Sequence, residues 1–311
     1  MHLLRISATA HGINYLPEYR ASRTGIFARL GLEVRARARD PWTGVLDDLA
    51  DGSADVALGG IWVPAMFAGR GRDLVAVGQL NGRFPMAIVT REPVAAFDWS
   101  WMTGRTVLVP GVGGTAPYEF TAGLMREGGC DPGGVKFVRD LSTGLLRELY
   151  ENGLGDAIVA DPLTATVLRL GGHGYMSCHL ADVGGVMPNS VYYVQRERLA
   201  ELREPIAALL EGVQEAMAAL TAGASTDAVC AAEWPDGPAE ALADAAHYLA
   251  GNGTWPGVRI ERDGCERWFS ILRERGLAGP AATYDALVDH TALDGADALG
   301  IESGIAPLGS H

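Results

Sequence analysis

A glycine turn in the middle of the chain has residues suited to holding a small anion. It follows an apolar run at 106–109 that predicts a strand, and it spans residues 111–118, with Gly113, Gly114 and Thr115 at its centre. Thr115 suits the N-cap of a helix that would begin near Pro117 and Tyr118. Glycines let a ligand approach the backbone, and free N–H groups at a helix start attract anions. The turn and Tyr118 therefore predict one wall of a binding site for a small organic anion.

His11 is the main candidate for proton transfer. It ends the first predicted strand, and imidazole is the side chain best matched to proton transfer near neutral pH. A loop histidine that is bonded only to backbone is the alternative. The sequence contains no G-x-S-x-G, no metal-ligand spacing and no G-x-x-x-x-G-K-[ST]. The residues therefore predict neither a serine nucleophile nor a metal or nucleotide cofactor.

Further candidates for ligand contact follow other predicted strands. Gly59 and Gly60 end the third strand and would allow close backbone approach, and Trp62 would either stack on a ligand or lie in the core. Arg83 would either pair a carboxylate with two hydrogen bonds or lie in solvent. Side chains that could hydrogen-bond a ligand are Tyr15, Asp161 and Asn189.

Composition narrows the class of protein. The 311 residues, 48% of them hydrophobic, suffice for roughly two domains. A net charge of −13 argues against nucleic acid and against an anionic membrane surface as partner. No apolar run approaches the ~18 residues of a membrane span. The four cysteines are far apart without a C-x-x-C, which argues against a zinc knuckle or a redox pair.

The beginning of the chain bears on its location. Met1 leads directly into a predicted strand, without a charged segment followed by an apolar one. We therefore expect a cytoplasmic protein. The alternative is a periplasmic or cell-surface protein whose signal peptide was removed.

The order of the predicted elements indicates an α/β fold. Strands are predicted at 3–8, 32–38, 54–58, 74–79 and 86–90, with helices at 16–30, 42–51 and 59–68. After a break at 92–102 the pattern restarts, with strands at 106–109, 135–138 and 157–160 and helices at 117–127, 143–152 and 162–170. A strand at 190–195 and helices at 204–222, 226–233, 239–249 and 262–275 follow. This alternation predicts mainly parallel sheets with helices on both faces.

The repeated unit predicts two lobes. Lobe I would comprise residues 1–91 and 189–311, lobe II would comprise residues 92–188, and two crossing strands would form the hinge. Ligands of open α/β sheets bind at the carboxyl ends of the strands. The expected site is therefore a cleft between the lobes.

Several runs resemble type II periplasmic-binding-protein-like chains. They are N-Y-L-P-E-Y at 14–19, L-A-D-G-S-A-D-V-A-L-G-G at 49–60, T-G-R-T-V at 103–107, G-G-T at 113–115 and G-D-A-I-V-A-D-P at 155–162. Their order and spacing, over about residues 3–290, resemble the branch with sulfonate-, nitrate- and thiamine-precursor-binding proteins. The resemblance implies a two-lobed clamp that binds a small molecule. It leaves the function open, because this fold hosts receptors and enzymes.

Two functions are compatible with these residues and this fold. A solute-binding component of an ABC importer explains the clamp and the lack of a catalytic motif, but it requires export and a permease. A cytosolic enzyme without a cofactor would use His11 as proton carrier in lyase, decarboxylase or isomerase chemistry. We expect the enzyme, because no export signal is visible. A cytosolic sensor is a third alternative, and a homodimer is left open.

Overall fold

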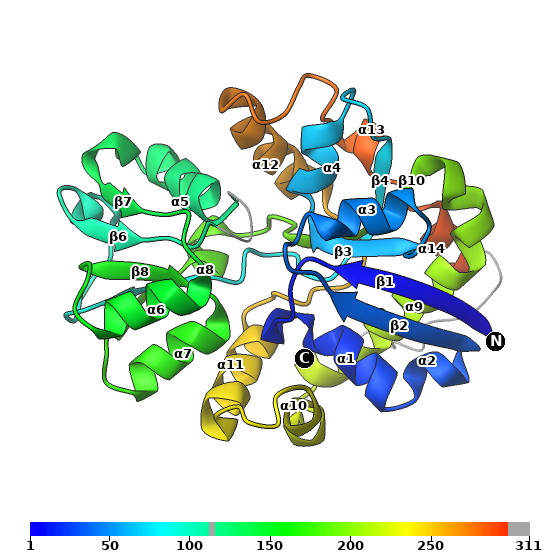
Figure 1. The fold of residues 1–311 in the computed structure, drawn as a ribbon, viewed down its shortest axis with the longest axis horizontal. Coiled ribbons are helices and arrows are strands. Elements are labelled where there is room, and N and C mark those ends of the chain that lie inside the picture. Colours follow the sequence, from blue (N-terminus) through cyan, green and yellow to red (C-terminus); the bar gives the residue numbers. More distant parts are fainter. Residues whose placement is uncertain (112–115, 298–311) are drawn as a thin grey trace, which may run out of the picture.

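Two five-stranded sheets form the two lobes of the protein (Figure 1). The computed structural model describes residues 1–111 and 116–297. We call the body around the sheet that contains the N-terminal strand the first lobe, and the body around the other sheet the second lobe. Helices cover both faces of each sheet, as the buried clusters on either side demonstrate.

The sheet of the first lobe has the strand order β2-β1-β3-β10-β4. Its strands are β1 (His2–Ala8), β2 (Leu32–Ala38), β3 (Val56–Gly60), β4 (Leu74–Gln79) and β10 (Ser190–Gln195). Strand β1 runs parallel to β2 and β3, whereas β10 runs antiparallel to β3 and β4. One face packs on α1 (Leu16–Arg23), α2 (Ile26–Arg29) and α9 (Leu199–Thr221), and the other on α3 (Gly44–Ala50) and α4 (Trp62–Phe67).

The sheet of the second lobe repeats this arrangement in the order β7-β6-β8-β5-β9. Its strands are β5 (Ala87–Thr90), β6 (Thr106–Leu108), β7 (Lys136–Val138), β8 (Ala157–Ala160) and β9 (Tyr175–His179). Helix α5 (Ala116–Glu127) covers one face, and α6 (Thr143–Glu151) and α7 (Pro162–Leu170) cover the other.

The expected parallel sheets are mixed because each contains one strand that arrives from the other lobe. Strand β5 pairs antiparallel with β8 and β9, so the strand predicted at the end of the first unit belongs to the second sheet. Strand β10 returns to the first sheet in the same manner. A strand can pair parallel with its predecessor only if a long crossover returns the chain to the same end of the sheet. Strands β5 and β10 come directly from the other lobe without such a crossover, and they pair antiparallel. The lobe boundaries at residues 91 and 189 stay a prediction.

Local backbone chemistry explains where single elements differ from the prediction. The helix expected at 16–30 is split into α1 and α2, because Gly25 between them has a left-handed φ of 79°. The sequence did not predict β9, α8 (Leu180–Gly184), α13 (Tyr284–Leu287) or α14 (Thr291–Asp297). The remaining elements are α10 (Asp227–Glu233), α11 (Ala239–Gly251), α12 (Arg262–Glu274) and the 3-10 turns Ile13–Tyr15, Trp99–Met102, Pro132–Gly134 and Arg196–Arg198.

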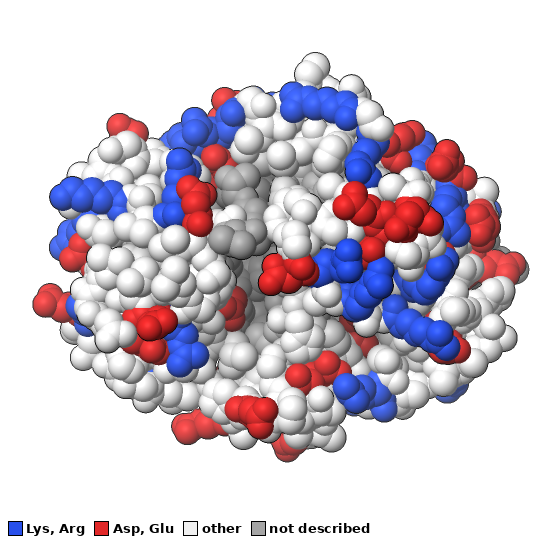
Figure 2. All heavy atoms as spheres, viewed as in Figure 1, with Lys and Arg blue, Asp and Glu red and all other residues white. Residues whose placement is uncertain are grey.

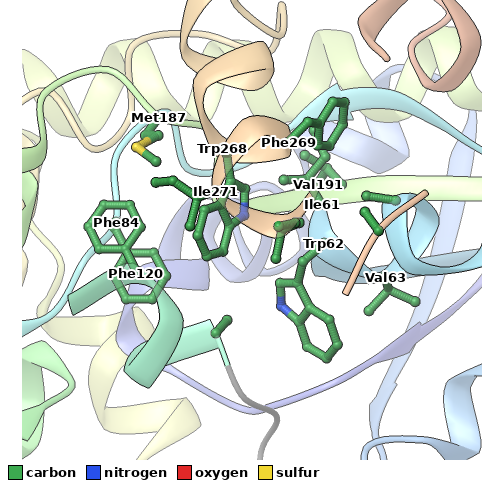
Figure 3. Close-up of a cluster of buried hydrophobic side chains, with 14 of the residues drawn as sticks. Ile61, Trp62, Val63, Phe84, Phe120, Met187, Val191, Trp268, Phe269 and Ile271 are labelled. Atoms are coloured by element: carbon green, nitrogen blue, oxygen red, sulfur yellow. The ribbon is translucent and has the colours of Figure 1, made fainter. Parts of the chain in front are cut away.

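A buried apolar cluster joins the two lobes (Figure 3). Phe84, on the link between the lobes, stacks on Phe120 of α5 with 4.0 Å between ring centroids. Phe120 also meets Trp268 of α12 edge-to-face at 5.6 Å. The cluster continues to Ile61 and Trp62 in the first lobe. Helix α12 therefore packs against both lobes through apolar side chains.

Polar contacts join the lobes along α11. Tyr248 of α11 stacks on His179 with 3.9 Å between centroids, and its hydroxyl donates to Asp182 Oδ2 at 3.3 Å. Arg169 of α7 pairs with Asp244 of α11. Exposed ion pairs of this kind contribute about 0–1 kcal/mol, so the Arg169–Asp244 pair adds little to the contact between α11 and the second lobe.

No helix within residues 1–111 and 116–297 combines the length and the apolar composition needed to cross a bilayer.

Candidate functional site

A groove runs between the two lobes (Figure 2). In the first lobe, Ser190 at the start of β10 pairs with Gly60 at the carboxyl end of β3. In the second lobe, Ala87 at the start of β5 pairs with Ala160 at the carboxyl end of β8. The crossing strands thus begin beside the carboxyl ends of the parallel strands. This is the edge where open α/β sheets bind ligands, and it faces the groove.

A network of amides around the buried Asn81 forms the floor of the groove on the side of the first lobe. Asn14 Nδ2 donates to Asn81 Oδ1 at 2.9 Å, and Asn81 Nδ2 donates to the Asn14 carbonyl at 2.9 Å. The backbone N–H of Asn189 donates to the Asn81 carbonyl at 2.9 Å, and the Trp255 indole donates to the Asn14 carbonyl at 3.0 Å. Asn81 is fully buried and therefore ties the loop after β1 to both crossing segments. Asn81 was not predicted as a site residue, because an asparagine after a strand is an ordinary turn residue.

Tyr15 and Asn189, both predicted to contact a ligand, lie on this floor. Tyr15 is buried, and burial raises the pKa of its phenol, while side-chain hydrogen bonds with Ser190 and Thr9 act in the opposite direction. Asn189 is half-buried, and its amide donates to Ser190 Oγ at 3.3 Å. Ser190 therefore brings the two predicted residues together.

Gly59 and Gly60 are required for close packing within the protein. A Cβ on Gly59 would lie 2.5 Å from Thr9 Cγ2, and one on Gly60 would lie 1.9 Å from Trp62 Nε1. Trp62 is buried and meets Trp42 edge-to-face at 4.9 Å. The space above Gly60 is thus filled by Trp62, and the contact of these residues with a ligand stays a prediction.

His11 is held by residues from the C-terminal part of the chain. Its Nε2 lies 3.1 Å from Glu233 Oε2, and its ring lies against Tyr19 and Trp234 at centroid distances of 5.1 and 4.8 Å. With Tyr15, His11 lines a cavity of about 570 Å³ between α1, β2 and the end of α10. The structure thus adds Glu233 and Trp234 to this part of the first lobe, which the sequence analysis had not connected with His11.

Glu18 is a buried acid in the wall of the same cavity. Its Oε2 accepts a hydrogen bond of 2.8 Å from the Tyr192 hydroxyl. Burial raises the pKa of Glu18 to about 7, because the carboxylate loses its hydration, and the hydrogen bond from Tyr192 offsets only part of that cost. The Glu18 carboxyl therefore changes its charge near neutral pH.

In the second lobe, Tyr118 of α5 contacts Phe137 of β7 and Arg139, which follows β7. Its half-buried ring meets Phe137 edge-to-face at 5.1 Å, and the Arg139 guanidinium lies 4.2 Å from the ring centroid. The following residue, Asp140, has a φ of 69°, a left-handed conformation that is uncommon for a non-glycine residue. Asp140 lies two residues after the end of β7 and packs against the backbone of Gly111, a contact that was not predicted. Gly113, Gly114 and Thr115 lie outside the described residues.

Arg83, which was predicted to pair a ligand carboxylate, contacts two other segments of the chain. Its Nη1 donates to the Ala181 carbonyl at 3.3 Å, and its guanidinium lies against the backbone of Gly253. Arg83 therefore connects the link between the lobes with α8 and the segment after α11. Its predicted pairing with a ligand carboxylate is not tested by these contacts.

Asp161 is the N-cap of α7. Its Oδ1 accepts hydrogen bonds from the N–H groups of Leu163 and Thr164 at 3.1 and 3.0 Å, and its Oδ2 accepts from Thr164 Oγ1 at 2.6 Å. We expect Asp161→Ala to lower the free energy of unfolding by about 1 kcal/mol, as loss of an N-cap does, whereas Asp161→Asn should change it by a few tenths. Urea unfolding of both variants measures this, and an equal loss in both would contradict the capping role.

The comparisons with known proteins agree with this architecture. The profile of the NMT1/THI5-like family matches residues 13–223, which is more than half of the chain. The chain therefore belongs to the NMT1/THI5-like family.

Individual relatives are distant in sequence. YtlA of Bacillus subtilis, described as a candidate binding protein, is 23% identical over 203 residues, which cover 63% of this chain and 59% of that protein. The ligand-binding component of an ABC-type import system from Staphylococcus aureus is 13% identical with a TM-score of 0.73, covering 94% of this chain and 98% of its own. The aliphatic sulphonate binding protein SsuA from Escherichia coli is 17% identical with a TM-score of 0.72, covering 91% of this chain and 95% of its own.

These relatives contradict our prediction from the sequence that the protein is an enzyme. The family match is accompanied by proteins that are described as binding proteins and not as lyases, decarboxylases or isomerases. The catalytic role expected for His11 depended on that prediction and is withdrawn with it. The physical reason for the error is that the two-lobed fold is shared by receptors and enzymes, so only site chemistry distinguishes them.

Proposed function

We propose that this protein is the solute-binding component of an ABC importer and holds its solute in the groove between the lobes. The main support for the proposal is that the carboxyl ends of the parallel strands of both lobes lie at the groove. The amide network around Asn81 makes one wall rigid before any ligand arrives, which lowers the entropic cost of binding.

The solute that we propose is sulfonate-, nitrate- or thiamine-precursor-like. Support comes from the family match and from the sulphonate named in the description of SsuA. Asn189 suits such a solute, because its amide makes only one hydrogen bond within the described residues and keeps donor capacity for an oxygen of the ligand.

A permease partner and a location outside the cytoplasmic membrane follow from the same proposal. A receptor that supplies an importer must meet its solute on the outer side of the membrane. We therefore propose a periplasmic or cell-surface location in place of the cytoplasmic one expected from the sequence. The support is that a relative of similar fold is described as part of an ABC-type import system.

The proposal is tested by calorimetric titration of alkanesulfonates, nitrate and pyrimidine thiamine precursors into the purified protein. One class should bind with a saturable signal. Asn189→Ala should weaken that binding at least about tenfold, because a lost hydrogen bond to a charged ligand costs about 1.5–3 kcal/mol. Its matched control is Asn152→Ala, an exposed asparagine that follows α6 and bonds the Glu148 carbonyl.

Two results would reject the proposal. One is that no compound of the three classes binds saturably. The other is that a bound compound is converted to a product by the protein alone.

A further inference from the structure

A second cavity lies at the opposite edge of the first sheet from the groove. It has a volume of about 430 Å³ and is formed by the loop between α4 and β4, the residue after β10 and the region of α13. The charged side chains in its lining are those of Arg70, Arg72, Asp73 and Arg196.

The distance from the groove follows from the strand directions. Strand β4 is antiparallel to β10, which is antiparallel to β3, so β4 and β3 run the same way. The amino end of β4 carries the cavity, whereas its carboxyl end leads to Asn81 on the floor of the groove. Six residues of strand span about 20 Å. A ligand in this cavity would therefore be separate from a ligand in the groove.

Two of the three arginines are held in place by the protein. Arg72 Nη1 donates to the Leu46 carbonyl at 2.6 Å. Arg196 donates from Nε to Asp73 Oδ1 at 2.9 Å and from Nη2 to the Ala286 carbonyl at 2.5 Å. Each guanidinium has five N–H donors in a rigid fork. Both arginines are thus oriented by some of their donors and keep others for a ligand.

Arg70 is the third cation and has the weakest attachment. Its Nη1 lies 3.4 Å from the Leu277 carbonyl, and no acidic side chain within the described residues pairs with it. Gly71, with a φ of 93°, adopts a conformation that favours glycine and lets the chain turn between Arg70 and Arg72. Both arginines consequently flank one cavity.

The balance of charge is unusual for this protein. Two carboxylates accompany the three arginines, because Asp73 pairs with Arg196 and Asp47 Oδ1 lies 3.7 Å from Arg72 Nη2. The charge around the cavity is therefore about +1 in a chain of net charge −13, and Arg70 carries it. Grouping like charges is unfavourable unless an anion or solvent compensates them. Guanidinium groups match the paired oxygens of phosphate and sulfate with two parallel hydrogen bonds.

We propose that this cavity is a second binding site, for a phosphate- or sulfate-type oxyanion. The anion would lie between Arg70, Arg72 and Arg196, either as a free ion or as the headgroup of an anionic lipid. The site does not depend on the solute that the groove binds.

The test is a calorimetric titration of inorganic phosphate and of sulfate into the purified protein. We expect saturable binding that weakens at least about tenfold in Arg70→Glu, because a cation that faces the anion becomes an anion. The matched control is Arg126→Glu, an exposed arginine at the end of α5 that should leave binding unchanged. No saturable binding, or an equal loss in both variants, would overturn the proposal.

Two further arms separate the alternatives. Asn189→Ala in the groove should leave phosphate binding intact, and a loss there would assign the anion to the groove and overturn the second site. Vesicles of phosphatidylglycerol, compared with phosphatidylcholine, distinguish the source of the oxyanion. Vesicle binding that is lost in Arg70→Glu assigns a lipid headgroup, whereas phosphate binding without vesicle binding assigns a free ion.

Discussion

Replacing Glu18 with glutamine is expected to raise the free energy of unfolding by roughly 3 kcal/mol at pH 8 and to change it little at pH 4. The pKa of Glu18 rises from 4.5 to about 7 on folding, because the carboxyl is fully buried beside the Tyr192 hydroxyl. Each pKa unit of this rise corresponds to about 1.36 kcal/mol. The rise from 4.5 to about 7 therefore corresponds to a change in the free energy of unfolding of roughly 3 kcal/mol. Glutamine keeps an oxygen that can accept from Tyr192, and it never acquires a charge.

The direction in pH follows from the raised pKa. Below pH 4.5, Glu18 is protonated in both the folded and the unfolded chain and costs nothing. Between pH 4.5 and about 7, the unfolded chain releases this proton while the folded chain still holds it, so the free energy of unfolding falls as the pH rises. Above about pH 7 the loss is complete.

Urea unfolding between pH 4 and pH 8 measures this difference. The control is Glu215→Gln, an exposed glutamate on α9 whose replacement should leave the pH dependence as in the parent protein. Parallel curves for the parent and Glu18→Gln over this range would show that the buried carboxyl is not the titrating group.

Replacing Trp268 with alanine is expected to lower the free energy of unfolding by about 3–5 kcal/mol, the usual cost of deleting a buried aromatic side chain. Trp268 is 1% exposed and contacts Phe120 of the second lobe from α12. Its removal would leave a cavity in the cluster that joins the lobes (Figure 3). The packing between α5 and α12 should therefore loosen together with the global stability.

Trp101 is the matched tryptophan for this experiment. It is half-buried in the second lobe, with the Arg105 guanidinium 4.2 Å from its ring centroid. Urea unfolding followed by near-ultraviolet circular dichroism should give a much smaller loss for Trp101→Ala than for Trp268→Ala. Equal losses would argue that the cluster between the lobes contributes no more than a half-buried surface tryptophan.

Much of the fold was predictable because the pattern of each element is local. Strands β4, β8 and β10 and helix α7 begin and end at the predicted residues. Strand β9 was missed because its polar Ser177 and His179 hide the apolar pattern of an edge strand. The direction of β5 was missed because strand pairing depends on which lobe the chain comes from.

The candidate site was predictable only in part. The positions of Tyr15 and Asn189 at one edge of the sheet follow from strands that end together, and the structure places both beside Ser190. The amide of Asn81 was not predictable, since its partner Asn14 is 67 positions away. Asp161, predicted as a ligand contact, uses its carboxylate to cap α7.

By itself, the sequence determined the α/β class, the two units and the resemblance to binding proteins, because periodicity and motif order are properties of neighbouring residues. Only the tertiary structure decided which side chains meet. His11 lies against Glu233, 222 positions later, and Arg196 lines one cavity with Arg70 and Arg72, which lie far from it in the sequence. Such contacts arise when packing brings distant segments together, and for that reason neither the partner of His11 nor the second cavity was visible in the sequence.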